Sequence, residues 1–225
     1  MERAHPVVDY RQLRLSRLGD PAFSHLKLLM YWPLFGLLFL YVERLSPVTT
    51  YTPVSCPLDS RIPFCELFLI PYLFWFVYLI GMHLYTLLYD VEAFRRLMGF
   101  IIVSYTAAIV VYFIFPTCQN LRPEIFPRDN TFTRFLYYFY QFDTNTNVCP
   151  SIHVIGSIAV CCTAFSMPRF RSRGWKWAFS VTAALICAST VFLKQHSVVD
   201  VLAAIPVCLA AYYISFRKGA FHARR

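Results

Sequence analysis

Charged residues are scarce in this 225-residue sequence, where Asp, Glu, Lys and Arg together make up 15% of the chain. Soluble domains contain about 25% charged residues, so the low share excludes an ordinary water-soluble globule. Hydrophobic residues reach 58% and aromatic residues 18%. Several apolar stretches approach or exceed the ~20 residues with which a helix crosses a bilayer. The composition therefore indicates an integral membrane protein.

Several common catalytic and nucleotide-binding motifs are also absent. Only seven glycines occur and none forms a phosphate-binding loop, which argues against a backbone cradle for a nucleotide. The sequence lacks CxxC, HExxH and GxSxG, the patterns of thiol redox centres, zinc proteases and serine hydrolases. It also has no low-complexity segment, obvious repeat or flexible linker, so one domain over residues 1–225 is predicted.

Six hydrophobic segments are predicted to cross the membrane as helices. The predicted spans are Leu26–Val42, Glu66–Tyr89, Leu97–Pro116, Ser151–Met167, Trp175–Leu193 and Val198–Phe216. The first 25 residues are polar and lack the apolar core of a cleavable signal peptide. The predicted fold class is an all-α integral membrane protein with six transmembrane helices.

Lysine and arginine are distributed unequally between the two predicted sides. Fifteen of the 21 basic residues fall on the side that holds both chain ends, and six fall on the other side. By the positive-inside rule, both termini are predicted to be cytoplasmic. The net charge of +9 is interpreted as a topology signal and as contacts with anionic lipid headgroups. No nucleic-acid partner is predicted.

The predicted connections differ between the two sides. On the cytoplasmic side, DVEAFRR and PRFRSRG are predicted to be tight basic turns. On the outer side, Ser46–Pro63 holds four prolines and is predicted to be a loop. The longer outer segment Thr117–Pro150 contains the aromatic stretch TFTRFLYYFYQF. This stretch is predicted to be a short helix at the outer interface, with a helix packed on the spans as the alternative.

Four of the eight cysteines lie on or next to the predicted outer segments: Cys56, Cys65, Cys118 and Cys149. An even number confined to the outer face suits one or two disulfides. The pairs Cys56–Cys65 and Cys118–Cys149 are one possibility, and four free thiols are the alternative.

Two of the six histidines, His153 and His196, are predicted to begin spans at their outer ends. They would therefore lie at the same membrane depth and share one pocket. Asp200 follows His196 by four residues, and on a helix its side chain would lean back toward that ring. A carboxylate there would fix the tautomer of the histidine, as the orienting group of a catalytic triad does. The alternative is a His–Asp pair that only caps the last span.

Other residues near these histidines suit a phosphate. Ser151 supplies a hydroxyl, and the starts of two spans supply free backbone N–H groups. Arg122 offers two N–H bonds, and Lys194 offers a point charge. The alternatives are an interfacial anchor for Arg122 and a snorkelling lysine for Lys194. Because cations favour an anion over a divalent metal, neither a metal nor a cofactor is predicted.

These residues resemble the three signature motifs of the type 2 phosphatidic acid phosphatase superfamily. The motifs are Lys-x6-Arg-Pro, Pro-Ser-x-His and Ser-Arg-x5-His-x3-Asp. Here RP stands at 122–123, PSIH at 150–153 and HSVVD at 196–200. The resemblance covers about Phe115 to Ile205, in the same order and with similar spacing, and six spans is the usual architecture of the membrane members.

The resemblance implies a role for each member of the triad. His196 would be the nucleophile that forms a phosphohistidine, with Asp200 orienting it. His153 would be the general acid that protonates the leaving oxygen and then activates the acceptor. The family works without metal.

This sequence departs from the family motifs at two cationic positions. The first motif has lysine where this chain has Phe115, and the third has Ser-Arg where it has Ser189 and Thr190. CPSIH followed by KQHSVVDV is similar to the branch that contains inositol phosphorylceramide and sphingomyelin synthases. That branch transfers a phospho-headgroup to a lipid alcohol. A phosphodiester carries one charge and a monoester about two, so fewer cations suit a transferase.

The leading hypothesis is a lipid phosphatase in the plasma membrane, with its active site on the extracytoplasmic side. Its substrate would be a phospholipid or a polyprenyl or sphingolipid-type lipid. The alternative is a lipid headgroup phosphotransferase, and a minor alternative is a non-catalytic lipid-binding membrane protein. A transporter fits less well, because the ionisable residues gather at one interface and not at mid-membrane.

Overall fold

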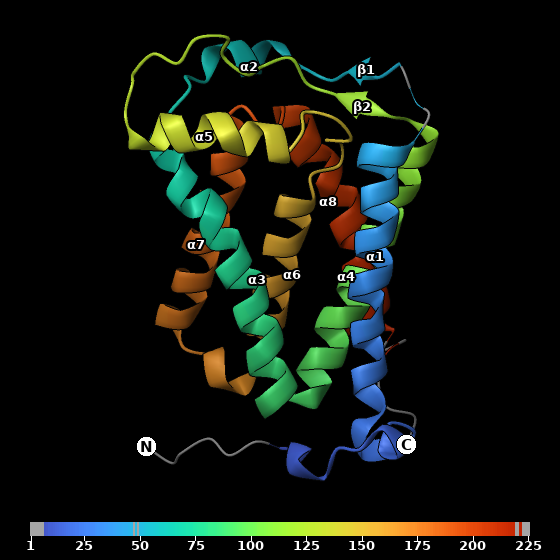
Figure 1. The fold of residues 1–225 in the computed structure, drawn as a ribbon. Coiled ribbons are helices and arrows are strands. Elements are labelled where there is room, and N and C mark those ends of the chain that lie inside the picture. The colour runs from blue at the N-terminus through green and yellow to red at the C-terminus, as the bar shows by residue number, and fades with distance from the viewer. Residues whose placement is uncertain (1–6, 47, 49, 219–220, 222–225) are drawn as a thin grey trace.

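The computed structural model describes residues 7–46, 48, 50–218 and 221, and Figure 1 shows them as a bundle of helices. The helices are α1 (Tyr31–Leu40), α2 (Pro57–Arg61), α3 (Leu69–Tyr89), α4 (Val91–Ile114), α5 (Thr131–Phe142), α6 (Ile152–Ser166), α7 (Arg173–Phe192) and α8 (Val198–Tyr212). Short 3₁₀ and π segments are η1 (Tyr10–Gln12), η2 (Leu15–Arg17), η3 (Pro21–Met30), η4 (Tyr41–Leu45), η5 (Glu66–Phe68), η6 (Pro168–Phe170) and η7 (Tyr213–Arg217). Two short strands, β1 (Thr52–Pro53) and β2 (Thr117–Cys118), pair in parallel. The predicted all-α class is confirmed.

Five helical stretches among the described residues are long and apolar enough to cross a membrane. They are Pro21–Leu45, Glu66–Tyr89, Val91–Ile114, Arg173–Phe192 and Val198–Arg217. Each corresponds to a predicted span. The predicted span Ser151–Met167 corresponds to α6, whose 15 residues fall short of the ~20 that a full crossing needs. The structure thus shows a helical membrane protein with five full-length candidate spans and one shorter apolar helix.

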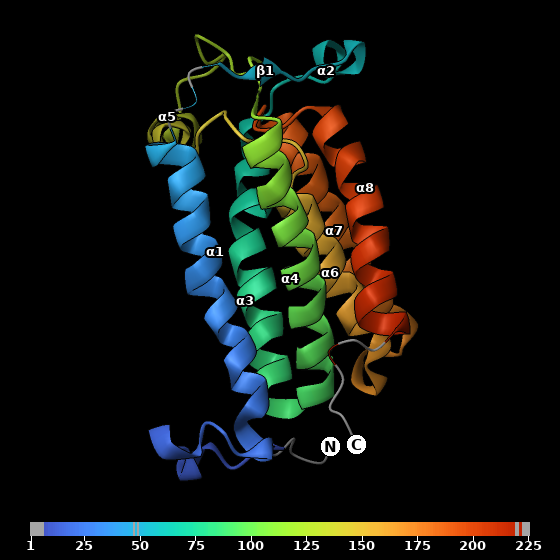
Figure 2. The same ribbon diagram turned by 90° about the vertical axis from the view of Figure 1, so that its right-hand side faces the viewer.

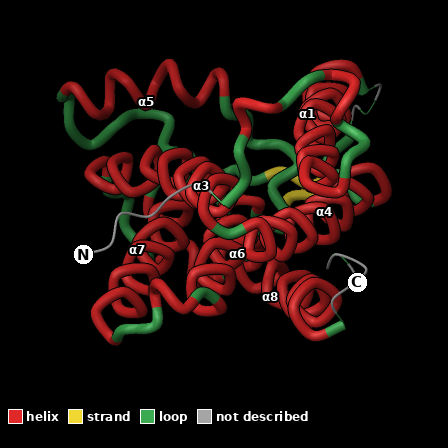
Figure 3. Tube along the Cα trace, turned by 90° about the horizontal axis from the view of Figure 1, so that it is seen from below, coloured by secondary structure: helices red, strands yellow, loops and turns green. Residues whose placement is uncertain are grey.

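α6 lies in the middle of the bundle. Viewed along the bundle in Figure 3, it is surrounded by α3, α4, α7 and α8, and it contacts all four. Gly156 permits this close approach, because a Cβ atom there would lie 2.8 Å from the Tyr105 hydroxyl and 2.9 Å from Nε1 of Trp75. The short helix that begins after PSIH is therefore held by neighbours on several sides.

Two helices begin earlier than predicted. The stretch DVEAFRR is not a turn, because Asp90 caps α4 by accepting a hydrogen bond from the Ala93 N–H at 2.9 Å. α4 therefore starts at Val91, and the basic residues lie in its first turns. In PRFRSRG, Ser172 caps α7 in the same way, with the Trp175 N–H 3.4 Å from its hydroxyl. In both cases the side-chain cap satisfies a helix N–H group that would otherwise lack a partner.

The outer segment predicted as a loop contains regular structure. Within Ser46–Pro63, β1 pairs with β2, and α2 forms a short helix. Pro57 occupies its first position, where a missing N–H costs nothing. Asp59 accepts a hydrogen bond from the Cys56 N–H at 2.7 Å. The prediction of an irregular loop is therefore wrong over these residues, since local capping outweighs the four prolines.

The predicted aromatic helix is present as α5. Asn130 caps it by accepting from the Thr133 N–H at 3.1 Å, and Leu136 is buried in a cluster with Leu69, Tyr72 and Leu193. Figures 1 and 2 show α5 lying across the end of the bundle near α2, β1 and β2. The helix therefore packs on the bundle, and its place at a membrane interface stays a prediction.

The cysteines are free thiols. All eight lie among the described residues, and none is paired. The possible pairs Cys56–Cys65 and Cys118–Cys149 are therefore not formed, and the alternative of four free thiols describes the structure. Burial and the neighbouring Asp200 carboxylate raise the pKa of the Cys149 thiol to about 12, which keeps that thiol protonated.

Candidate active site

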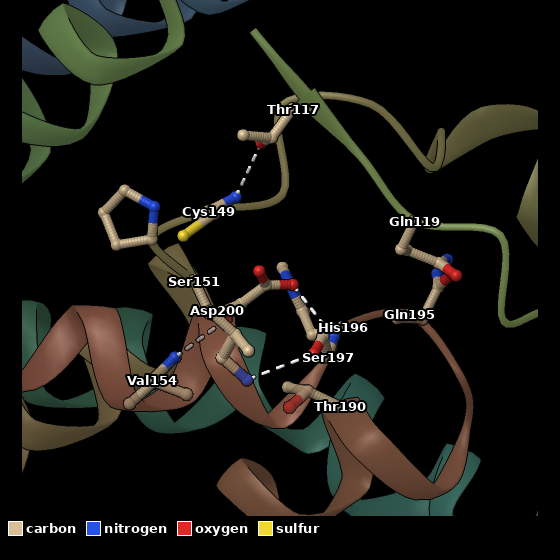
Figure 4. Close-up of polar contacts among 12 residues, drawn as sticks. Thr117, Gln119, Cys149, Ser151, Val154, Thr190, Gln195, His196, Ser197 and Asp200 are labelled. Atoms are coloured by element: carbon tan, nitrogen blue, oxygen red, sulfur yellow. Dashed lines mark hydrogen bonds and ion pairs between the residues drawn. The ribbon is translucent and has the colours of Figure 1, made fainter. Parts of the chain in front are cut away.

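His196 lies in the turn between α7 and α8, one residue before Ser197, the N-cap of α8. Its Nδ1 atom is 3.2 Å from Oδ2 of Asp200 (Figure 4). The contact that the i, i+4 spacing predicts is present, but His196 is not on the helix. Asp200 reaches back because it belongs to a capping box, in which the same oxygen accepts the Ser197 N–H at 2.9 Å.

The contact with Asp200 has a consequence for the histidine tautomer. An ionised carboxylate can only accept hydrogen bonds, so the contact assigns a proton to Nδ1 of His196. The lone pair of the neutral ring then lies on Nε2, where a nucleophile needs it.

The backbone of the turn is fixed by the end of α7. The carbonyl oxygen of Thr190 accepts the N–H groups of both Gln195, at 2.9 Å, and His196, at 3.0 Å. Lys194 adopts a φ of 55°, a left-handed conformation that is uncommon outside glycine. These contacts place His196 over the end of the bundle.

His153 is the second residue of α6, and its ring packs between two aromatic side chains of α3. The ring centroids of Tyr72 and Trp75 both lie 4.4 Å from that of His153. The rings of His153 and His196 are 5.8 Å apart. The Ser151 N–H also donates to the Asp200 carbonyl at 3.2 Å, which ties the start of α6 to the first turn of α8. The structure therefore brings the two predicted histidines together.

Both histidines line a cavity of about 200 Å³ at this end of the bundle. Its other lining residues are Gly36, Phe39, Leu40, Glu43, Arg44, Tyr72, Tyr112, Phe142, Asp143, Thr144, Thr146, Asn147, Val148, Ile152 and Gln195. They come from α1, η4, α3, α4, the end of α5 and the segment after it, the start of α6, and the turn before α8.

Sequence reasoning missed two charged residues that line the cavity, Glu43 and Arg44. The Glu43 carboxylate receives hydrogen bonds from Thr144, from Thr146 at 3.2 Å and from Asn147 at 2.7 Å. Arg44 donates to the carbonyl oxygens of Gln141 and Phe142. The one signal in the sequence was an acidic and a basic residue directly after an apolar span.

Asp143 is a second carboxylate in the cavity that sequence reasoning missed. It accepts hydrogen bonds from the Tyr72 hydroxyl at 2.6 Å and from Nε2 of Gln195 at 3.0 Å. Burial raises the pKa of the Asp143 carboxyl above its ordinary value, although these donors and nearby His196 and Arg122 act against that rise.

Ser151 and the two helix starts are only partly available for a phosphate. The Ser151 hydroxyl caps α6 by accepting the Val154 N–H at 3.5 Å. In α8, Ser197 N–H, Val198 N–H and Val199 N–H each have a side-chain acceptor. The predicted anion site at the start of α8 is therefore already occupied by protein groups. In α6, the N–H groups of Ile152 and His153 remain, since the leading N–H groups of a helix have no partner within it.

Arg122 lies behind the cavity wall. It donates to the carbonyl oxygens of Tyr140 and Asp143 and to the side-chain oxygen of Gln195, and it stacks 4.3 Å from the Tyr140 ring centroid. Burial lowers the pKa of the Arg122 guanidinium, and the Asp143 carboxylate opposes this effect. Arg122 thus does not line the cavity itself, but it contacts Asp143 and Gln195, which do.

Lys194 faces away from the cavity. Its Nζ atom donates to the carbonyl oxygens of Asp59, at 2.7 Å, and Ile62, at 2.6 Å. The positions of the two missing family cations hold an exposed Phe115 and a buried Thr190. The three positions therefore bring no cation to the cavity wall.

Comparison with known families agrees with the motif resemblance. Residues 96–221, more than half of the chain, match the family model of the PAP2 superfamily. The chain therefore belongs to this superfamily, whose members are generally phosphatases or phosphotransferases. No curated protein and no solved structure matches the chain. The matched range includes His153, His196 and Asp200, but it leaves out α1 and α3, which supply part of the cavity.

A metal site is not evident at the cavity. Among the residues that the structure describes, no group of three or more His, Cys, Asp or Glu side chains is placed to hold a metal ion. Metal-independent catalysis stays a prediction.

Proposed function

We propose that the protein is a membrane-embedded lipid phosphatase that cleaves a lipid phosphoester through a phosphohistidine on His196. The observation that carries this proposal is the pair of histidines at one cavity, with the His196 ring held 3.2 Å from Asp200. Membership of the PAP2 superfamily supports the same reaction class.

The proposed reaction has two steps. Nε2 of His196 attacks phosphorus, the ester P–O bond breaks, and the leaving oxygen takes a proton from His153. A water molecule then returns a proton to His153 while its oxygen attacks phosphorus, and the P–N bond to His196 breaks. Asp200 stabilises the positive charge on the His196 ring throughout. Backbone N–H groups at the start of α6 bind the phosphoryl oxygens, and Arg122 adds positive potential from behind the wall.

The proposal includes the orientation of the protein. α6 is taken as a sixth, shortened crossing inside the bundle, and both termini are placed in the cytoplasm. The cavity then opens at the extracytoplasmic side of the plasma membrane. This orientation is supported by the bias of the basic residues and by Figure 2, where the blue N-terminal segment and the red end of the last helix lie at the end of the bundle opposite α5.

A second candidate is transfer of a phospho-headgroup to a lipid alcohol. The observation that favours it is the charge of the cavity wall, where Glu43 and Asp143 face the site and Arg44 is the one lysine or arginine among the lining residues. A phosphate monoester carries about two negative charges and would meet this wall unfavourably. In this reaction His153 would take its second proton from the alcohol and not from water.

Turnover of a phospholipid labelled in its phosphate distinguishes these candidates. Purified protein in detergent is incubated with the labelled lipid and an excess of a lipid alcohol. Labelled free phosphate is expected from the phosphatase, and a new labelled phosphodiester lipid with diacylglycerol from the transferase. A non-catalytic protein would give neither product.

Two histidine variants test the shared intermediate. An acid-labile phosphoryl group is expected on the wild-type protein after rapid quenching. His196→Ala should remove it, whereas His153→Ala should form it more slowly and also release it slowly. Label that persists in His196→Ala would show that the nucleophile is another residue.

A further inference from the structure

The α2 segment, residues 56–65, is joined to the turn that carries His196. The link is the buried carboxylate of Asp59. Asp59 is 1% exposed, and its Oδ2 accepts the Ser197 hydroxyl at 2.6 Å and the Cys56 N–H at 2.7 Å. Its Oδ1 accepts the Val198 N–H at 2.8 Å. A residue 138 positions away in the chain thus caps the first turn of α8.

Lys194 joins the same two segments, but here the side chain reaches from the turn to the α2 segment. Its ammonium group donates to the carbonyl oxygens of Asp59 and Ile62 at the end of α2, where helix carbonyls lack an internal partner. The Cys65 N–H donates to the Phe192 carbonyl at 3.0 Å, at the end of α7 just before the turn. The turn is therefore tied to the α2 segment both before and after His196.

We propose that Asp59 and Lys194 are positioning residues, which together clamp the turn 194–197 and so hold the His196 ring against Asp200. This inference rests on the proposed function of His196 as nucleophile. Neither residue lines the cavity, so each acts through the turn and not on the substrate.

Ser197 transmits the effect of this clamp. Its hydroxyl donates to Asp59 and accepts the Val199 N–H at 3.1 Å. Its own N–H donates to Oδ2 of Asp200, the oxygen that contacts His196. Displacing Ser197 would therefore move both partners of the His196–Asp200 contact.

An ionised Asp59 suits this role better than any neutral residue. Two carboxylate oxygens accept three donors here, and a negative charge at a helix N-terminus is favourable. Burial alone would raise the pKa of Asp59, but the hydrogen bonds from Ser197, Val198 and Cys56 outweigh it and lower the pKa below its ordinary value. An amide at this position offers one acceptor atom in place of two.

Variants on both sides of the clamp test the proposal. For Asp59→Asn and Lys194→Met, kcat is expected to fall by about 100-fold, as for a misplaced reacting group, while KM stays within about twofold of the wild-type value. Lys194→Arg should restore most of kcat, because a guanidinium can also donate to two carbonyls. Arg61→Gln removes an exposed charge from the same short helix and serves as the matched control, with wild-type kinetics.

The rate of phosphohistidine formation after mixing with labelled phospholipid provides the second measurement. If wild-type protein forms no phosphohistidine, the proposed function fails. If it does and Asp59→Asn forms it at the wild-type rate, the clamp is overturned. Equal losses in kcat and affinity, or no rescue by Lys194→Arg, would also overturn it. Should Asp59→Asn not fold, Ser197→Ala removes the contact from the other side and is expected to give the same loss of kcat.

Discussion

The two ring nitrogens of His196 have different surroundings, and this difference would allow the ring to act as a nucleophile. Nδ1 faces the Asp200 carboxylate, while the ring itself borders the cavity beside His153. Asp200 combines two tasks that are usually separate. It completes the capping box of α8, and it contacts Nδ1 of His196, which it would orient in the proposed reaction. The proposed chemistry at His196 would therefore depend on a helix cap.

Replacing Asp200 by asparagine separates these two tasks. The amide oxygen of Asp200→Asn can still accept the Ser197 N–H, so α8 should remain capped. Activity with labelled phospholipid is expected to fall by about 10³- to 10⁴-fold, because the amide cannot stabilise an imidazolium ion. Thermal unfolding in detergent serves as the control and should change little. Activity within tenfold of wild type would contradict the assigned role.

Asp143 predicts a dependence of stability on pH. Burial raises the pKa of this carboxyl in the folded protein, so the folded state binds the proton more tightly than the unfolded state. This group therefore stabilises the fold less as pH rises from about 4, the ordinary value for aspartate, through the raised pKa. The wild-type protein should lose stability over this range relative to Asp143→Asn, which does not titrate. The measurement is the difference in Tm between the two proteins at each pH. A difference that does not change with pH would contradict the prediction.

At the scale of elements, α6 determines where His153 lies. The helix is shorter than its neighbours, yet it contacts four of them. Its His153 ring packs on Trp75, and the Trp75 ring also limits the space at Gly156. The packing of α6 against α3 is thus coupled to the position of His153, the proposed general acid.

Gly156→Ala tests this coupling. The added methyl group would lie within 3 Å of Tyr105 and Trp75, so the protein should lose about 1–3 kcal/mol of stability by overpacking. Turnover should also fall, because Trp75 must shift against His153. Gly81→Ala is the matched control: no atom lies within 4 Å of its added methyl group, and alanine favours a helix. Thermal unfolding and turnover are compared for both variants, and equal behaviour would refute the coupling.

At the scale of the whole molecule, the cavity lies at one end of the bundle, under α2 and α5. The described N-terminal residues and η7 lie at the other end (Figure 1). Most of the basic residues belong to that second end in the predicted topology. The cavity and most of the basic residues therefore lie at opposite ends of the bundle in the predicted topology.

Cysteine labelling in intact cells tests the orientation. Ser60 and Arg171 are exposed residues at the α2 end and the η6 end of the bundle. A membrane-impermeant maleimide should label Ser60→Cys above the wild-type level in intact cells. It should label Arg171→Cys above that level only after permeabilisation. The reverse pattern would place the cavity in the cytoplasm.

Sequence alone predicted the candidate spans and α5, with ends at most six residues from those observed, because hydrophobic length and periodicity are local signals. It missed α2. The starts of α4 and α7 were misplaced because the polar and basic stretches that contain the caps Asp90 and Ser172 were interpreted as turns. His153, His196 and Asp200 were predicted to lie together because their types and spacing carry chemical information, and the structure places them together. Lys194 was anticipated as a phosphate ligand, but its direction depends on a turn with positive φ.

Sequence by itself determined that this is a helical membrane protein of the PAP2 superfamily with a His, His and Asp set, since apolar length and short motifs are written along the chain. Only the tertiary structure decided which groups surround that set. Glu43 and Asp143 reach the cavity, and Asp59 reaches Ser197, through contacts between residues about 50 to 140 positions apart. Such contacts have no period or spacing, because they arise when separate helices pack and bring their ends together.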